Sequence, residues 1–268
     1  MARPTNATAR GEPAGTGGAP APDPVVAGGV AIGSGTFTLI ARSEVALGAE
    51  RLLEAARLAC EARAGLLDVG RAWELLDADA VEAFQRASGL GAVCAVGEPG
   101  DVAAVAPVAA LLRVSVTALE GSLLPRALGT AGLPVLLERP TGAGVQAWLR
   151  AAERIEQEGN PDVVLCDPGD DLAAVPALRS AAARPLVVDA SPGRRGHRDA
   201  AALARAAAAV GADGVTIGVD SELDGLSSQL DAVAAAVGRR MAGRRIRYVG
   251  GQGAGRRAGD TSERWRRR

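Results

Sequence analysis

Apolar residues along this chain come in short runs, and each run is followed by a longer segment in which apolar residues recur at helical spacing. The helical pattern is clearest over 49–62 and 144–158, where Leu, Ala, Trp and Ile recur. Runs without polar alternation are typical of parallel strands that are covered on their outer face. The predicted strands are 36–41, 65–69, 92–96, 111–115, 134–138, 162–166, 185–189 and 214–219.

Eight strand–helix units in succession predict an α/β fold, a (β/α)₈ TIM barrel, which typically takes ~250 residues. The sixth helix, over 172–183, is expected to be the shortest. Before the first unit, two apolar stretches within residues 25–35 flank Gly28 and Gly29, a pattern that predicts a small β-hairpin. We expect this hairpin to plug one end of the barrel.

The two ends of the chain lack this pattern. Residues 1–24 are rich in Ala, Pro, Gly and Thr and predict a disordered tail, because they cannot bury enough surface to offset the entropy of ordering. Residues 239–268 are Gly-rich and carry eleven arginines, opposed only by Asp260 and Glu263. They predict either a solvated disordered tail or an electrostatic handle for an anionic partner such as nucleic acid or an acidic protein surface. The expected organisation is therefore 1–24, 25–238 for hairpin and barrel, and 239–268.

Composition narrows the chemistry. The formal net charge is −1, so no global attraction to nucleic acid or a membrane is expected. The sequence shows neither a signal peptide nor an apolar stretch of ~20 residues that could span a membrane. Cys60, Cys94 and Cys166 lie in apolar runs. Together these features favour a cytoplasmic protein with buried thiols. The sequence contains no lysine, which excludes a Schiff-base aldolase or a pyridoxal enzyme, and His197 is its only histidine.

Several stretches keep the order and spacing of one enzyme family. They are 30–33 with 37–41, then 132–139, 148–153, 158–166, 184–189 and 204–214. Over roughly residues 25–237 the chain resembles class I 3-deoxy-D-arabino-heptulosonate 7-phosphate (DAHP) synthases of the bacterial type, as a degenerate member. The resemblance implies a barrel that joins phosphoenolpyruvate to a sugar-phosphate aldehyde at a divalent metal.

The positions that the resemblance assigns to phosphate binding have changed. Trp73 stands at a lysine of a substrate loop that is mostly missing, and Thr117 stands at an arginine. Glu138 replaces the lysine of a Lys-Arg pair, and Pro168 replaces a further arginine. Phosphoenolpyruvate needs cationic and backbone donors, so this loss argues against binding by the family's route.

The metal ligands that the resemblance implies are also replaced. The ligand cysteine of Gly-Pro-Cys-Ser falls in the run Arg42-Ser43-Glu44-Val45, the ligand histidine becomes Pro192, and the ligand glutamate becomes Gly218. Only Asp224 keeps the position of the last ligand. Because a divalent ion needs several converging ligands, we expect no metal, no cofactor and no catalytic residue of the family.

A loop over 191–198 follows the seventh predicted strand, at the barrel face that often holds phosphate. It is either an anion site with two arginines and an imidazole or a flexible basic loop. Asp189 either contributes to a site or caps a helix, and the acidic turn over 167–171 is first of all turn chemistry. Trp73 is expected to fill the barrel mouth, and Trp148 to anchor a helix. The candidate ligand-binding residues are Arg139, Asp189, Arg194, Arg195, His197 and Asp224.

Two functions remain open. The favoured one is a non-catalytic relative of DAHP synthase that binds another protein, such as an active synthase, or an anionic small molecule, and that regulates or assembles in aromatic, shikimate-type or specialised metabolism. Such a protein is expected to form homo-oligomers or hetero-oligomers. The alternative is a divergent 3-deoxy-7-phosphoheptulonate synthase-type aldol transferase whose site is rebuilt around the six candidate residues.

Overall fold

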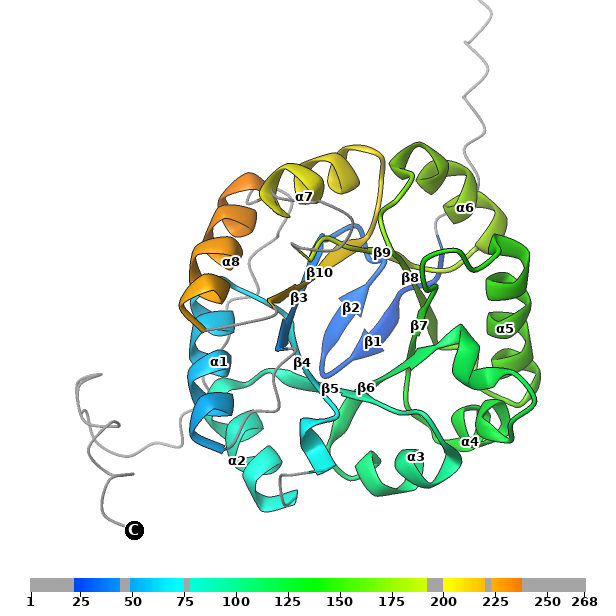
Figure 1. The fold of residues 1–268 in the computed structure, drawn as a ribbon, viewed down its shortest axis with the longest axis horizontal. Helices are drawn as coiled ribbons and strands as arrows, with labels where there is room; N and C mark the ends of the chain where they lie inside the picture. Colours follow the sequence, from blue (N-terminus) through cyan, green and yellow to red (C-terminus); the bar gives the residue numbers. More distant parts are fainter. Residues whose placement is uncertain (1–21, 44–48, 75–77, 192–199, 220–222, 238–268) are drawn as a thin grey trace, which may run out of the picture.

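The computed structural model describes residues 22–43, 49–74, 78–191, 200–219 and 223–237. Eight parallel strands form a closed barrel in chain order, and β10 closes it by pairing with β3 from Gly214↔Thr38 onward (Figure 1). The strands are β3 (Thr38–Ser43), β4 (Leu66–Gly70), β5 (Gly91–Ala95), β6 (Ala109–Ser115), β7 (Val135–Glu138), β8 (Val163–Asp167), β9 (Leu186–Asp189) and β10 (Gly214–Val219). The predicted (β/α)₈ barrel is confirmed.

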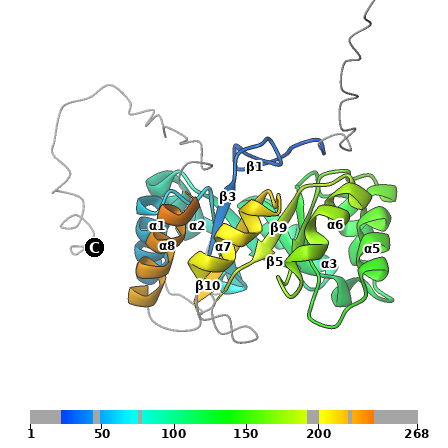
Figure 2. The same ribbon diagram turned by 90° about the horizontal axis from the view of Figure 1, so that it is seen from above.

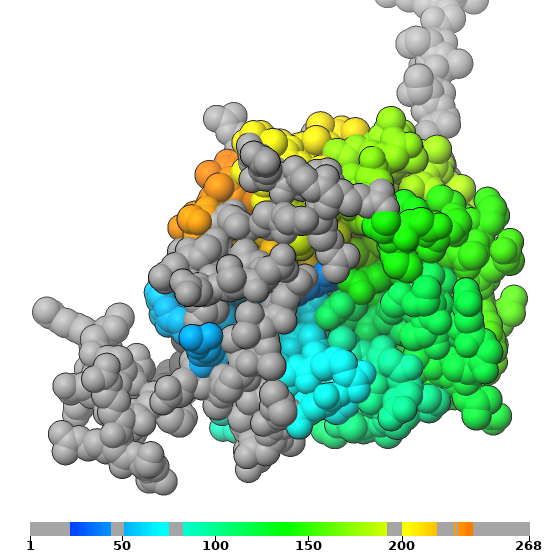
Figure 3. Space-filling model, viewed as in Figure 1, coloured from blue at the N-terminus to red at the C-terminus, as the bar shows by residue number. Residues whose placement is uncertain are grey.

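A ring of helices surrounds the barrel, and in the space-filling view α3 to α6 (green) form a continuous rim (Figure 3). The helices are α1 (Ala49–Glu61), α2 (Ala78–Ser88), α3 (Pro99–Val105), α4 (Leu124–Thr130), α5 (Val145–Gln157), α6 (Val175–Ala182), α7 (Ala200–Ala209) and α8 (Leu223–Val237). The expectation that the sixth helix is the shortest was wrong: α6 has 8 residues, whereas α3 and α4 have 7 each. Between β6 and α4 the chain first forms a short 3₁₀ helix, η2 (Val116–Leu119), which leaves fewer residues for α4. Pro125 lies in the first turn of α4, where proline is compatible with the start of a helix.

The predicted hairpin is also confirmed. Strand β1 (Val25–Ala27) pairs with β2 (Val30–Ile32) across Gly28 and Gly29, whose φ angles of +52° and +76° favour glycine at a tight hairpin turn. The hairpin packs on the amino-terminal end of the barrel, where a Cβ on Gly28 would lie 2.9 Å from Cα of Gly91 at the start of β5 (Figure 2). Its side chains join the apolar cluster inside the barrel, so this end is plugged.

The buried side chains divide into two clusters, one between strands and helices and one inside the barrel. In the outer cluster Trp148 is fully buried and donates from Nε1 to the carbonyl oxygen of Leu137 at 2.9 Å, so its predicted role as a helix anchor is confirmed. Cys94 and Cys166 are buried thiols, and neither they nor Cys60 forms a disulfide. No helix of the described residues is both long and apolar enough to cross a membrane.

The first barrel strand lies two residues later than predicted: β3 runs over Thr38–Ser43 instead of 36–41. The shift brings Arg42 into the strand, fully covered, although a charged residue argues against a buried strand in a local reading. Acidic side chains from other strands make this placement possible. Of the predicted tails, only residues 22–24 are described, and 239–268 lie outside the described residues.

Candidate functional site

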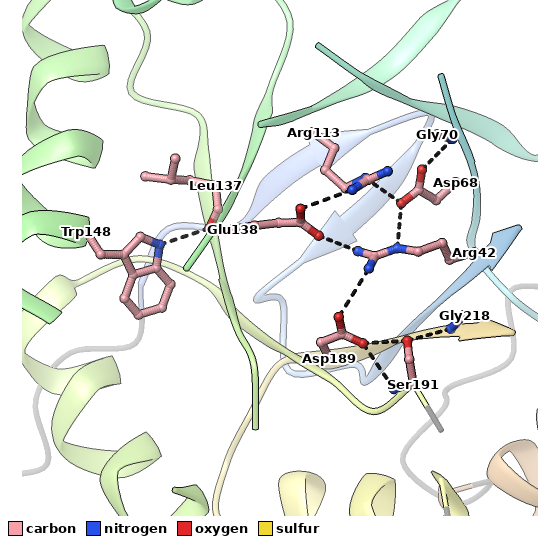
Figure 4. A network of polar contacts seen from close by, with 10 residues as sticks. All are labelled: Arg42, Asp68, Gly70, Arg113, Leu137, Glu138, Trp148, Asp189, Ser191 and Gly218. Carbon is pink, nitrogen blue, oxygen red and sulfur yellow. Dashed lines mark hydrogen bonds and ion pairs between the residues drawn. The ribbon is translucent and has the colours of Figure 1, made fainter. Parts of the chain in front are cut away.

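Five charged side chains lie at the carboxyl ends of the barrel strands and point into the barrel (Figure 4). Each follows by two positions a residue of the interior apolar cluster, and because strand residues two apart share a face, all five face inward. They come from β3, β4, β6, β7 and β9, and we call them the mouth cluster: Arg42, Asp68, Arg113, Glu138 and Asp189. Barrel enzymes place their active sites at this end.

Arg42 is the centre of the mouth cluster. Its Nε donates to Oδ2 of Asp68 at 2.9 Å, its Nη1 to Oδ2 of Asp189 at 3.1 Å and its Nη2 to Oε1 of Glu138 at 2.6 Å. Each nitrogen of the guanidinium therefore bonds a different carboxylate. The Arg42 side chain is only 2% exposed, so this cation is held inside the protein by three strands other than its own.

Arg113 forms the outer part of the mouth cluster. Its Nη1 donates to Oε2 of Glu138 at 3.0 Å, and its Nε lies 2.8 Å from Oδ2 of Asp68 in an ion pair that lacks hydrogen-bond geometry. Asp68 also accepts from the backbone N–H of Gly70 at 2.8 Å. Three carboxylates thus face two guanidinium groups, which leaves the cluster with one net negative charge.

The charges of the mouth cluster stabilise one another. Burial by itself lowers the pKa of Arg42, but attraction by Asp68, Glu138 and Asp189 outweighs it and raises that pKa well above its usual value. The pKa of Arg113 is raised by the same balance between burial and the two carboxylates beside it. Burial also raises the pKa of Cys166, which faces the same interior, so this thiol stays protonated and is a poor nucleophile or ligand.

Asp189 connects the mouth cluster to the last barrel strand. The backbone N–H and Oγ of Ser191 donate to Oδ1 of Asp189 at 3.0 and 2.5 Å, and the N–H of Gly218 donates to Oγ of Ser191 at 2.7 Å. Asp189 thus accepts from Arg42 with one oxygen and from Ser191 with the other. Of its two sequence interpretations, these contacts favour a place in the barrel mouth.

Arg139, another candidate, lies on the other side of β7. Its Nη2 is 2.6 Å from Oδ2 of Asp167, its Nη1 donates to the carbonyl oxygen of Ala143, and its guanidinium lies 5.5 Å from the ring centre of Trp148. These contacts join β7, β8 and α5 in the layer between strands and helices. The structure therefore does not bring Arg139 together with Asp189.

The remaining candidates are largely outside the described residues. Arg194, Arg195 and His197 fall in the undescribed range 192–199. Asp224 is the second residue of α8, where only the backbone is described.

Local contacts test two further expectations, one for Trp73 and one for the acidic turn after β8. Trp73 does not fill the barrel mouth as expected: it is half-buried against the strand–helix cluster, and its Nε1 donates to the carbonyl oxygen of Ala95 at 2.8 Å. The turn after β8 behaves as turn chemistry predicts, since Asp167 accepts from the N–H of Gly169 and Asp171 from that of Ala173. Within the described ranges, no group of three or more His, Cys, Asp or Glu side chains is arranged to hold a metal ion.

Sequence reasoning missed Arg42, Asp68 and Arg113 as functional residues. A local signal for them exists: each is a charged residue near the end of an apolar strand run, two positions after a large apolar residue. In a barrel this position faces the mouth. The signal gives the face of each residue but not its partners.

The protein is thus a (β/α)₈ barrel whose amino-terminal end is closed by a hairpin and whose charged mouth cluster lies at the end where barrel enzymes place their active sites. The model of the DAHP synthetase I family matches residues 69–232, more than half of the chain, and the chain belongs to this family.

Solved and curated relatives agree with this assignment. The phospho-2-dehydro-3-deoxyheptonate aldolase of Thermotoga maritima is 30% identical over 187 residues, which cover 61% of this chain and 55% of that protein. A truncated form of 3-deoxy-D-arabino-heptulosonate 7-phosphate synthase from Thermotoga maritima superposes with a TM-score of 0.67 at 27% identity, covering 81% of this chain and 94% of that one. A second structure of the Thermotoga maritima aldolase gives a TM-score of 0.64 at 27% identity over 81% and 75% of the two chains. The chain thus spans about half the length of the curated relative it matches.

Proposed function

We propose that this chain is a non-catalytic member of the DAHP synthetase I family and that it acts as a regulatory or assembly partner in aromatic, shikimate-type or specialised metabolism. The observation that carries the first half is the guanidinium of Arg42, bonded to three carboxylates inside the barrel mouth. The chain's own charges occupy the place where a barrel enzyme receives its substrate.

The electrostatics of the mouth oppose a phosphorylated enol. Phosphoenolpyruvate carries a phosphate and a carboxylate, and its binding needs cations with free donors. Both arginines of the mouth cluster are already paired with carboxylates, and the cluster has one negative charge in excess. Separating a buried pair to bind a ligand costs about 3–5 kcal/mol, because a charge is left without its partner.

The same arrangement does not fit the divalent metal that the family implies. Asp68, Glu138 and Asp189 are the acids of the mouth cluster, and all three bond the guanidinium of Arg42. A metal ion among them would have to replace or repel that cation. We therefore derive no catalytic step through a metal at these residues.

A turnover assay tests the first half of the proposal. The purified full chain is incubated with phosphoenolpyruvate, erythrose 4-phosphate and Mn²⁺, and loss of the enol absorbance and release of phosphate are followed, with the Thermotoga maritima enzyme as positive control. We expect no rate above background and no tight Mn²⁺ binding by calorimetry. Product formation would establish the alternative, a divergent aldol transferase.

The second half of the proposal concerns the partner. If the chain does not turn over substrate, its function would depend on binding through the surface of the barrel. The partner that we propose is a related barrel enzyme. We expect the tagged chain to co-elute with the host's active synthase and to change its rate or its response to inhibitors. Separate elution together with an unchanged synthase rate would contradict the partnership but not the loss of catalysis.

A further inference from the structure

The three carboxylates around Arg42 match the shape of its guanidinium. A guanidinium is planar with donors on three edges, and here Nε, Nη1 and Nη2 each bond one carboxylate, from β4, β9 and β7 respectively. Three separate strands thus build one recognition site for one planar cation from a fourth strand, β3. We infer that the barrel mouth is a guanidinium-binding site and that the side chain of Arg42 is its intramolecular ligand.

Charge and burial support a cation as the ligand of this site. Without the guanidinium of Arg42, the four other members of the mouth cluster would be three carboxylates and one arginine, which leaves two excess negative charges among them. Asp68 and Asp189 are 0% and 3% exposed, so water screens these charges poorly. The site would take up a cation that can reach all three carboxylates.

The geometry selects guanidinium over a metal ion or ammonium. In the described part of the chain these acids do not form a metal-binding group, because they lie around a guanidinium instead of converging on one point. Ammonium presents its donors as a compact tetrahedron and cannot extend along three edges of a plane. Free guanidinium has the same planar CN₃ frame as the head group of Arg42.

A second observation, independent of the carboxylates, is an unused polar group in the barrel interior. Oγ1 of Thr216 is buried and has no hydrogen-bond partner among the described residues. Thr216 is aligned with Asp189 in the register of β9 and β10, and it faces inward because Val215 and Ile217 on either side belong to the outer cluster. A free guanidinium has one more N–H than the head group of arginine, so a further acceptor in this interior suits it.

The inference goes beyond the proposed function and does not depend on whether the chain turns over substrate. Its test is chemical rescue in the full-length chain. Arg42→Ala removes the internal ligand, and Arg57→Ala is the matched control, because Arg57 forms ion pairs with Glu54 and Glu61 on the exposed face of α1. The thermal midpoint Tm of each protein is measured against guanidinium chloride up to 20 mM, far below denaturing concentrations, at constant total salt.

Above its Kd, guanidinium should raise the Tm of Arg42→Ala by about 3–5 °C for each tenfold increase in its concentration, and calorimetry should show saturable binding at one site. The wild-type chain and Arg57→Ala should show no such rise. Ammonium, Mn²⁺ and inorganic phosphate should stabilise Arg42→Ala less than guanidinium does. If Arg42→Ala is unfolded without guanidinium, the same titration is read by circular dichroism as recovery of helix. Arg42→Gln serves as a second variant that removes the charge but keeps the aliphatic part of the side chain.

Each result of this titration either supports or overturns a guanidinium-binding site in the barrel mouth. Saturable rescue by guanidinium and methylguanidinium confined to the Arg42 variants supports it. Equal rescue by ammonium or Mn²⁺ would show a general cation site and overturn the assigned ligand class. No rescue of either Arg42 variant, or stabilisation by phosphate instead, would overturn the site altogether.

Discussion

Restoring the lysine that the family resemblance places at Glu138 should damage this protein instead of repairing it. Glu138 is 19% exposed and bonds both Arg42, at 2.6 Å, and Arg113, at 3.0 Å. The wild-type mouth cluster has three acids and two arginines. In Glu138→Lys three cations face two acids, whereas Glu138→Gln leaves two of each.

The expected magnitudes follow from these contacts. Two unit charges about 4 Å apart near a protein surface interact by about 4 kcal/mol, and partial exposure of Glu138 reduces this figure. Glu138→Gln keeps an acceptor and loses only the charge of two contacts, so we expect a loss of about 2 kcal/mol in the free energy of unfolding. Glu138→Lys adds two repulsions, and we expect a loss of about 5 kcal/mol.

Urea unfolding of a double-mutant cycle with Arg113→Met measures this coupling. In the wild-type background Arg113→Met breaks an attractive pair and should destabilise the protein. In the Glu138→Lys background it removes a repulsion and should cost little or restore stability. Equal effects of Arg113→Met in both backgrounds, or a Glu138→Lys variant as stable as the wild type, would refute an electrostatically coupled mouth.

Three further predictions concern the scaffold and the buried thiols. Gly129→Ala should lower the free energy of unfolding by more than about 2 kcal/mol, because the new Cβ would lie 2.3 Å from Cβ of Glu158. Gly144 has open space around it, so Gly144→Ala should change that free energy by about 0.5 kcal/mol or less, and similar values for both variants would contradict this packing. Trp148→Phe should cost about 1–3 kcal/mol in urea unfolding, because it removes the Nε1 bond and part of a fully buried ring, and a neutral effect would argue against this packing. Burial raises the pKa of Cys94 from about 9 to about 12, so the folded state holds this proton more tightly and its contribution to stability is present below pH 9 and lost as pH rises toward 12. Cys94→Ala should reduce the slope of unfolding free energy against pH in that window by about 1.4 kcal/mol per pH unit, and an unchanged slope would contradict the shift.

Much of the fold was predictable because it depends on local patterns. Helix α5 (Val145–Gln157) differs from the predicted 144–158 by one residue at each end, since periodic Leu, Ala, Trp and Ile residues mark its buried face. The hairpin followed from Gly28-Gly29 between two apolar stretches. The end of β3 was misjudged because the apolar run ends at Ala41, while the strand continues through Arg42 to Ser43.

The candidate site was much less predictable. Asp189 ends one predicted strand and Arg139 directly follows another, and this one-residue difference sends them to opposite faces of the barrel wall. Sequence comparison identified Glu138 as a reversed charge, yet it gave no reason for the reversal. That reason is the pair of arginines that Glu138 bonds, which are 96 and 25 positions away in the chain.

The sequence by itself determined the succession of strands and helices, the closure of eight units and the family, because apolar periodicity, turn residues and motif spacing are properties of neighbouring positions. Only the tertiary structure decided what the charged residues of the mouth do. Arg42 bonds acids at positions 68, 138 and 189, and closing the barrel brings these strands together. A buried charge is stable only beside its partners, and partners so distant in sequence are defined by the fold.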